Sequence, residues 1–408
     1  MLISIADFKG MLPRFIPRLL PDNFAQVARN CRLEDGAISP MRYSLAAPDH
    51  TFGAAVMSFA YHADQWFGWP TVVSAVAGPV ATDRLYTTGE AKPKMWSAGT
   101  WYDLAVPSPG STPTIVVNGT VNPAISETIL YCYTYVTVND EESLPSPTSA
   151  ATLWSYPIIN TVGNIVTSAE ATARGVNRIR IYRSQTSDLG VTDFYFVAEV
   201  AAGTTAYAHN IVTAPLAEPI TSLDNDLPQD SLKGLISLPN GMMAAFAGKK
   251  LFFCEPFIPH AWPSKYSLTV DYPIVALVSF GSTIAVLTTG TPYVVQGTHP
   301  DSLVMERIEQ NLPCLSARGV ADLGYTAIYP STEGLVSISP SGAQVISKSM
   351  FTLEQWEAFV PASFIAGVHD GRYVFSFYDL GAFTRRVGFI DMTRSEEHTS
   401  ELQSRSAI

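Results

Sequence analysis

Two sets of carboxylates in this sequence could support chemistry. The first set has a spacing that loosely resembles a calcium loop, and it consists of Asp224, Asp226 and Asp230. It lacks the central glycine and the terminal bidentate glutamate of a helix-flanked calcium loop, so a solvated linker is favoured. The second set could supply the two carboxyl groups, about 5–10 Å apart, that a glycosidase needs, and it consists of Glu255, Asp271, Glu333 and Asp370. No sequence pattern brings these four together, and Asp370 belongs to an ordinary His-Asp-Gly turn.

A further acidic run, Asp140-Glu141-Glu142, falls in a turn between two expected strands. Charges in such turns normally face water, so solvated carboxylates are favoured over a paired acid and base. The histidines before residue 394 lack the close spacing of metal ligands, so each is expected to be a surface or turn residue; they are His50, His62, His209, His260, His299 and His369. No glycine-rich phosphate loop and no Gly-x-Ser-x-Gly motif occurs. The sequence therefore predicts that the protein is not an enzyme, with no catalytic, cofactor-binding or metal-binding residues.

Composition narrows the class of protein further. The chain has 408 residues, of which 47% are hydrophobic and only 15% charged, which is typical of folded domains and predicts two or three of them. The net charge of -11 disfavours a protein whose main functional surface binds phosphate groups. The four cysteines lie far apart without a Cys-x-x-Cys pair, which favours buried thiols over a zinc module or a disulfide scaffold; they are Cys31, Cys132, Cys254 and Cys314.

No membrane-spanning segment is expected. The longest charge-free stretch lies between Asp271 and Asp301, and its longest apolar run is only Ile274 to Val278. A membrane helix needs about 20 mostly apolar residues, so this stretch predicts strands.

Apolar hairpins recur in the C-terminal half of the chain. Their second strands are expected to begin 42, 42 and 38 residues apart, at Leu251, Tyr293, Leu335 and Tyr373. A four-stranded propeller blade occupies about 40–45 residues, whereas sandwich strands recur about every 8–12. The longer period favours a β-propeller over an irregular sandwich.

The N-terminal stretch, residues 1–108, shows two similar hairpins at 55–69 and 84–96. These are expected to be the first propeller blades. Ahead of them lies an arm, Leu12 to Asp22, which contains three prolines. Prolines exclude a helix here and favour an extended segment suited to contact with a neighbouring subunit.

The middle stretch, residues 109–222, follows a proline-rich linker and predicts about seven short alternating strands, the pattern of an antiparallel sandwich. Its tyrosine-rich strand, the turn Glu-Ser-x-Pro-Ser at 142–146 and Ile-Arg-Ile-Tyr-Arg at 179–183 resemble fibronectin type III-like modules. Residues 223–393 would hold the remaining blades. The expected fold class is all-β, a divergent β-propeller with an inserted fibronectin type III-like β-sandwich.

Two segments are more distinctive than ordinary strands and turns. The first, 20–42, contains Ala-Arg-Asn-Cys-Arg-Leu-Glu-Asp-Gly-Ala-Ile-Ser-Pro, which a blade hairpin with an Asp-Gly turn also explains. The second joins Leu-Ile-Ser-Leu-Pro-Asn-Gly-Met, within 233–243, to Glu-Pro-Phe-Ile-Pro-His-Ala-Trp-Pro at 255–263. Together they resemble the tail tubular protein B or nozzle group of short-tailed bacteriophages and prophages, and the related packaged-DNA stabilisation proteins. Residues 271–293 are similar too, and the resemblance spans 12 to about 391.

The resemblance implies a structural virion protein without an active site. Such subunits form a ring, typically of six copies, around the DNA exit channel below the portal and adaptor proteins of the tail. The ring retains packaged double-stranded DNA and lets it pass on ejection without sequence-specific binding. The acidity of the chain has two explanations: an acidic channel wall would let DNA slide, or the charge serves only to keep the protein soluble. Assembly would take place in the bacterial host cytoplasm. The alternative is a tail fibre or adhesin that binds host-surface glycans through the sandwich or the propeller.

The last residues form a separate case. Residues 394–404 read Arg-Ser-Glu-Glu-His-Thr-Ser-Glu-Leu-Gln-Ser and resemble one translated frame of a sequencing-adapter oligonucleotide. Residues 394–408 are therefore expected to be an artefact, and the blades of 223–393 to be a truncated set.

Overall fold

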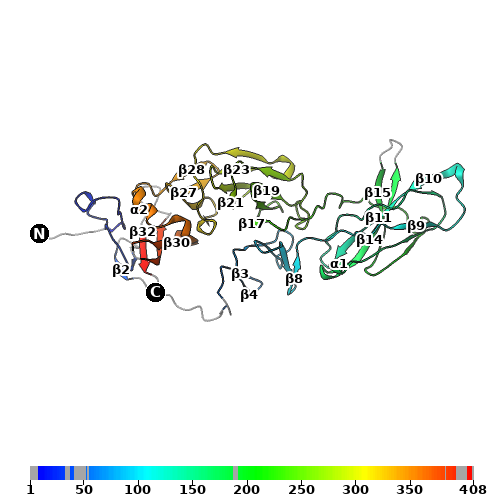
Figure 1. Cartoon of the computed structure of the whole chain (residues 1–408), viewed down its shortest axis with the longest axis horizontal. Helices are drawn as coiled ribbons and strands as arrows, with labels where there is room; N and C mark the ends of the chain where they lie inside the picture. The colour runs from blue at the N-terminus through cyan, green and yellow to red at the C-terminus, as the bar shows by residue number, and fades with distance from the viewer. Residues whose placement is uncertain are drawn as a thin grey trace.

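The computed structural model describes residues 8–32, 37–40, 52, 55–186, 192–381, 383–391 and 402–406. Among the described residues, strands account for 44% and helices for 7%, which confirms the predicted all-β class. Figure 1 shows small stacked sheets in one part of the molecule and a β-sandwich that extends from them.

Five antiparallel sheets in the described residues have four strands each, and every strand pairs with its neighbour in the chain. This meander is the strand arrangement of a propeller blade, as the repeat predicted. The first two sheets comprise β5 (Ser74–Ala77), β6 (Leu85–Thr88), β7 (Lys94–Ser97) and β8 (Thr100–Asp103), then β17 (Lys233–Ser237), β18 (Met243–Ala247), β19 (Lys250–Phe253) and β20 (Ser267–Thr269). The next two comprise β21 (Ile274–Phe280), β22 (Thr283–Thr288), β23 (Tyr293–Gln296) and β24 (Val304–Arg307), then β25 (Ala321–Asp322), β26 (Ala327–Ser331), β27 (Gly334–Ser339) and β28 (Gly342–Val345). The last comprises β29 (Ile365–His369), β30 (Arg372–Asp379), β31 (Thr384–Asp391) and β32 (Leu402–Ser406).

These sheets pack face to face in chain order. Strand β22 shows how: Ile284 and Val286 pack toward the sheet of β17–β20, whereas Ala285 and Leu287 pack toward the sheet of β25–β28. Successive side chains of a strand point to opposite faces of its sheet. A strand buried on both faces is therefore apolar at every position, and this explains the unbroken apolar runs in the sequence.

One predicted hairpin occupies a different place in its sheet. The hairpins near Leu251, Tyr293 and Leu335 are the second and third strands of their sheets, but the one near Tyr373 is β29–β30, the first and second. The shorter third spacing therefore compares strands that are not equivalent.

The N-terminal residues form two small hairpins and an arm. β3 (Ser58–His62) pairs with β4 (Gln65–Trp69), and β1 (Cys31–Arg32) pairs with β2 (Ser39–Pro40). The expected Asp-Gly turn at 35–36 lies outside the described residues.

The arm contains no α-helix in its described residues, only the single 3-10 turn η1 (Pro17–Leu19). Met11 and Leu12 are buried against Met350 and Trp356 of this same chain, and the Gln355 side chain donates to the Pro13 carbonyl at 3.0 Å. The buried part of the arm thus packs on the chain's own C-terminal sheets. Its exposed apolar side chains are Phe15, Ile16 and Leu19.

The sandwich is built from three small sheets. One has the order β16 (Tyr207–His209), β13 (Asn160–Gly163), β9 (Thr114–Val117), and another has the order β11 (Tyr131–Thr137), β14 (Val176–Thr186), β15 (Thr192–Ala201). The third pairs β10 (Ser126–Ile129) with β12 (Thr152–Ser155). Between them lies a core of tyrosine, isoleucine, valine and tryptophan side chains.

The Glu-Ser-x-Pro-Ser turn has a clear physical role. Ser143 and Ser146 each donate a backbone N–H to β11 and accept a β11 N–H on the side-chain hydroxyl. Pro145 and Pro147 have no N–H and cannot extend a regular ladder. The serine hydroxyls supply acceptors in its place and close the edge of β11.

The short helices lie in connections. They are η3 (Pro123–Ile125), α1 (Ala169–Ala173), η4 (Pro300–Ser302), η5 (Ala317–Gly319), α2 (Leu353–Glu357) and η6 (Pro361–Ser363). No helix among the described residues has the length and apolar character needed to cross a membrane.

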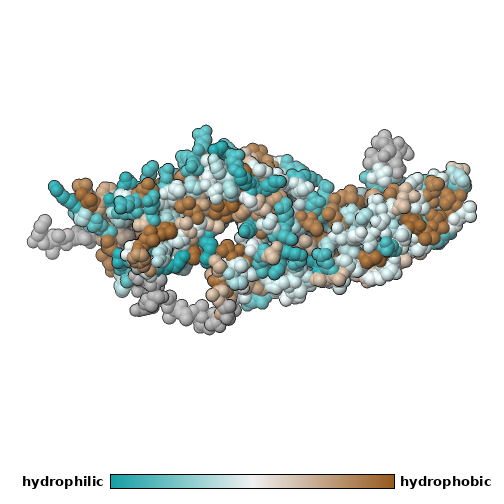
Figure 2. All heavy atoms as spheres, viewed as in Figure 1, coloured by the Kyte–Doolittle hydropathy of each residue, from teal (hydrophilic) through white to brown (hydrophobic). Residues whose placement is uncertain are grey.

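Apolar residues gather on the end of the sandwich that lies farthest from the stacked sheets (Figure 2). Exposed apolar side chains from this part of the chain include Val116, Ile125 and Leu153. Of residues 394–408, which include the suspected adapter segment, 394–401, 407 and 408 lie outside the described part, and β32 (402–406) pairs with β31.

Candidate functional site

The acidic run 140–142 lies in the turn after β11 and forms the centre of a polar network. Glu141 is 3% exposed and Glu142 is 9% exposed, so the prediction that these carboxylates face water is wrong. Asp140 has a positive φ of 62°, and the chain turns back so that Glu142 forms an antiparallel bridge with Val136. This reversal turns the two glutamates inward and leaves Asp140 at the surface.

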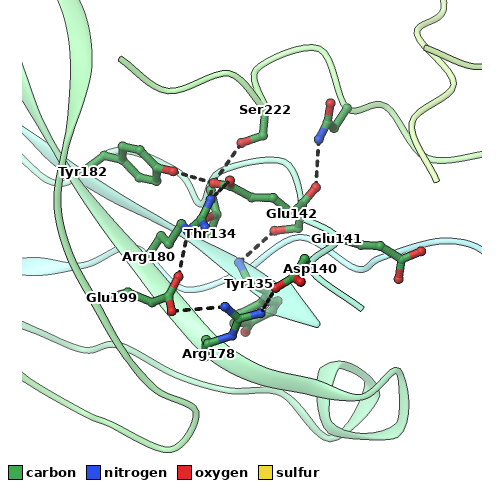
Figure 3. A network of polar contacts seen from close by, with 12 residues as sticks. Thr134, Tyr135, Asp140, Glu141, Glu142, Arg178, Arg180, Tyr182, Glu199 and Ser222 are labelled. Atoms are coloured by element: carbon green, nitrogen blue, oxygen red, sulfur yellow. Dashed lines mark hydrogen bonds and ion pairs between the residues drawn. The ribbon is translucent and has the colours of Figure 1, made fainter. Parts of the chain in front are cut away.

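The Glu142 carboxylate accepts four hydrogen bonds from described residues (Figure 3). Its Oε1 accepts from the hydroxyls of Thr134 at 2.7 Å, Tyr182 at 2.6 Å and Ser222 at 3.4 Å. Its Oε2 accepts from Arg180 at 2.8 Å. Burial, with the nearby carboxylate, raises the pKa of Tyr182. A carboxylate saturated by protein donors is poorly placed to take a proton from a substrate, so the network acts as a structural joint.

Two arginines of β14 extend this network toward the surface. Arg180 binds Glu199 at 2.9 Å, and Arg178 binds Glu199 at 3.2 Å and also pairs with Asp140. Burial opposes ionisation of Glu199, but the hydrogen bonds from Arg180 and Arg178 hold its pKa below the ordinary value. The Arg178 hydrogen bond likewise lowers the pKa of Asp140.

Glu141 joins the sandwich to the strand that precedes it. It pairs with Arg174 at 2.7 Å, and the two side chains are only 4% and 2% exposed. Arg174 also donates to the carbonyls of Ala105 at 3.2 Å and Leu104 at 3.4 Å, and its guanidinium lies 5.6 Å from the ring centre of Tyr102 in β8. One buried ion pair therefore binds the turn after β11 to the chain leaving the sheet of β5–β8.

The distinctive segment 255–263 closes the joint from the other side. The Glu142 carbonyl accepts from His260 Nε2 at 2.9 Å and from the Asn225 side chain at 2.8 Å. The Trp262 N–H donates to the Asp226 carbonyl at 2.8 Å. Burial lowers the pKa of His260, so this ring is neutral and donates through Nε2. We call the contacts of residues 141–142 with 174, 222–225 and 260, together with the contacts of Arg174 with 104–105, the interdomain joint.

The aspartates with calcium-like spacing lie in the linker near this joint, where two of them bind residues 264–265. Asp224 pairs with Lys265 at 2.6 Å, and the Asp226 carboxylate accepts the Ser264 N–H at 2.9 Å. Asp230 is exposed. The described residues contain no group of three or more side chains placed to hold a metal ion.

The four carboxylates considered for a glycosidase are spread over separate elements. Asp271 accepts the Tyr293 hydroxyl at 2.7 Å, Glu255 is half-buried near the joint, and Glu333 and Asp370 are exposed in hairpin turns. None of the four lines the cavity of about 670 Å³ between the sheets.

Among the other candidates, His209 is buried in the sandwich. Its Nδ1 lies 2.6 Å from the Tyr131 hydroxyl, its Nε2 lies 2.9 Å from the Ala214 carbonyl, and burial lowers its pKa. His62, His299 and His369 are partly or fully exposed, and His50 lies outside the described residues. Three of the four thiols are buried, as expected: Cys132, Cys254 and Cys314. The expectation is wrong for Cys31, which is only partly buried.

Comparison with known proteins gives only distant likenesses. No protein-family model matches the chain, and no curated protein matches it. The N-terminal domain of Nup159 is 10% identical, with a TM-score of 0.29 over 52% of this chain and 58% of that one. Apo AztD from Citrobacter koseri is 11% identical, with a TM-score of 0.29 over 79% and 72%. The WD40 domain of SCAP from fission yeast is 12% identical, with a TM-score of 0.27 over 78% and 62%.

The chain spans about half the length of the first solved structures that it matches, 46% and 58%. At these TM-scores the likenesses carry no argument about function.

Proposed function

We propose that this chain is a structural subunit of a bacteriophage or prophage tail. In this proposal, copies of the chain assemble as a ring, typically of six, against the other tail and adaptor proteins of the virion. The ring surrounds the DNA exit channel, retains the packaged duplex and lets it pass on ejection.

One observation carries the proposal: the residues of the two segments that resemble the nozzle group are used for packing, strand pairing and the interdomain joint. In the first segment, Ala28 packs in the core beneath the C-terminal sheets, and Cys31–Arg32 forms a strand paired with Ser39–Pro40. In the second, His260 and Trp262 bind the linker and turn of the interdomain joint. Distinctive residues used for packing and joints support a scaffold rather than a catalyst.

The outward sandwich also suits a ring subunit. Its core is separate from those of the stacked sheets, and its far end carries exposed apolar residues (Figure 2). A module placed in this way would lie on the outside of a ring and contact other tail proteins.

The test is negative-stain microscopy with light scattering on the full natural gene product. Rings around a channel wide enough for a DNA duplex are expected. A monomer or a slender trimer that binds host glycans would overturn the ring and favour the adhesin.

A second test addresses the acidic character of the chain. Once lumen residues are known from the ring, Glu→Lys and Asp→Lys changes there should slow DNA ejection, because a basic wall binds phosphates through counterion release. The same number of reversals on the outer face is the control. Equal ejection kinetics for both sets would contradict a role for lumen charge.

A further inference from the structure

An open cavity of about 670 Å³ lies between the stacked sheets. It is lined by parts of β5, β17, β21 and β25 and by the connection that contains η5. Each of these four strands is the first of its sheet, so one edge of each has no ladder partner within that sheet. Four strand edges thus converge on one space, and this volume lies within the range of about 300–1,000 Å³ that is common for small-molecule sites.

Two cations line this cavity although the chain as a whole is acidic. Lys233 is exposed at the start of β17, and its Nζ has no hydrogen-bond or ion-pair partner among the described residues. Arg318 is half-buried and donates one Nη2 hydrogen bond to the Met57 carbonyl at 3.0 Å, which leaves other guanidinium N–H groups available. Asp322 is the carboxylate among the described lining residues, and its Oδ1 accepts the Gly324 N–H at 2.7 Å.

The backbone of β17 is shaped to open this space. Gly234 has a φ of +63°, and the pairing of β17 with β18 shifts between Lys233 and Ile236. A β-bulge of this kind redirects the strand. Residues 233–236, which span this bulge, all line the cavity. A side chain at 234 would meet the Phe246 ring at 2.3 Å, so glycine is required.

We propose that this cavity binds a small organic anion that carries phosphate or carboxylate oxygens. Lys233 and Arg318 neutralise its charge from two different sheets, and the hydroxyls of Ser74 and Ser279 donate to its oxygens. The valine, leucine and phenylalanine side chains of the lining contact its apolar part. Oxyanions form their strongest hydrogen bonds with charged donors. The site does not depend on the proposed tail function.

A ligand bound in this cavity would contact sheets formed by segments that are far apart in the sequence. Ser74 comes from the sheet of β5–β8, Lys233 from that of β17–β20, and Arg318 from the approach to that of β25–β28. A ligand that binds the folded state alone raises the thermal midpoint in proportion to the logarithm of its concentration. Ligand binding should therefore stabilise the stacked sheets.

The test is calorimetric titration and thermal unfolding of the whole chain with pyrophosphate and with citrate at constant ionic strength. Lys233→Met and Arg318→Met should each weaken binding by about tenfold or more, as expected for loss of a charged donor. Lys249→Met, an exposed lysine in the β18–β19 turn, is the matched control and should bind like the parent. Equal binding by all four proteins, or no heat at millimolar anion, would overturn the site.

A second measurement does not depend on the variants. Lysine acylation read by mass spectrometry should show that pyrophosphate or citrate protects Lys233 and leaves Lys249 unchanged. Equal reactivity of Lys233 with and without anion would also overturn the proposal. Binding of duplex DNA that these anions do not displace would count against a small-molecule site. Ring assembly should be unchanged in Lys233→Met, which separates this proposal from the tail function.

Discussion

The buried pair of Glu141 and Arg174 offers the most decisive perturbation of the interdomain joint. Arg174→Met keeps most of the side-chain length and removes the charge. It also removes the hydrogen bonds to the Leu104 and Ala105 carbonyls and the contact with Tyr102. Glu141 would then remain as a buried carboxylate without its cation.

The expected cost is large because neither side chain can reach water. With side-chain exposures of 2% and 4%, removal of one partner should destabilise the local structure by about 3–5 kcal/mol. Hydrogen exchange with mass spectrometry can measure this locally, since each peptide reports its own opening free energy. Amides of β11 and β14 should exchange roughly 150-fold to 5,000-fold faster in Arg174→Met, while amides of β22 and β23 should be unchanged.

Two controls make the test specific. Lys92→Met breaks an exposed pair with Asp103, where both side chains are nearly half exposed, and it should leave exchange unaltered because such pairs contribute little. The double variant Glu141→Gln/Arg174→Met removes both charges and should be less destabilised than Arg174→Met, with a coupling of about 1–3 kcal/mol. Additive effects, or equal exchange in Arg174→Met and Lys92→Met, would refute the reasoning.

Three further predictions concern other parts of the fold. Burial lowers the pKa of His260, so the unfolded chain binds more protons than the folded one below about pH 6.5. Stability is therefore full above that pH and is lost as the pH falls toward the lower folded pKa; denaturant melts from pH 8 to 5 should show a shallower loss in His260→Gln. Burial raises the pKa of three thiols to about 12, so a thiol reagent at pH 8 should label them only after unfolding; they are Cys132, Cys254 and Cys314. Gly89 has a φ of +107° and a Cβ there would lie 2.4 Å from the Val72 carbonyl oxygen, so Gly89→Ala should lower the free energy of unfolding by about 1–3 kcal/mol. Gly324→Ala, with a positive φ and open space, should lower it less, and equal melting curves for the two variants would contradict the steric argument.

The repeat in the sequence could be recognised because its cause is local. Strands such as β22 are buried on both faces, so the central positions Ile284 to Leu287 are all apolar, and each hairpin displays this pattern without reference to distant residues. The displaced hairpin near Tyr373 shows the limit of this reasoning. An apolar pair of strands looks the same whether it is the first and second or the second and third of a sheet.

The interdomain joint could not be predicted in the same way. The rule that charges in a turn face water holds for Asp140 and fails for Glu141 and Glu142, because their partners lie far along the chain: Arg174 and Arg180 in the sandwich, and His260 after β19. The sequence did contain one indication of the joint. Burial of the acidic run 140–142 requires cations nearby, and β14 offers arginines at the alternate positions 178 and 180. Cross-strand pairing would have connected the two only after the register of β11 with β14 was known.

The joint also explains why a sandwich inserted in this place can hold a fixed direction. The chain passes between the stacked sheets and the sandwich twice, near 104–105 and near 222–226. Arg174, which pairs with Glu141 of the turn, holds the first crossing, and Asn225 of the second crossing binds the Glu142 carbonyl directly. A single crossing would leave the sandwich free to rotate about it, whereas two crossings fastened to one buried turn resist rotation. The contact of His260 with the Glu142 carbonyl adds a third attachment from the segment 255–263. If the sandwich positions other tail proteins outside a ring, this rigidity is what the role requires, and loss of the Arg174 pair should loosen its orientation before either part unfolds.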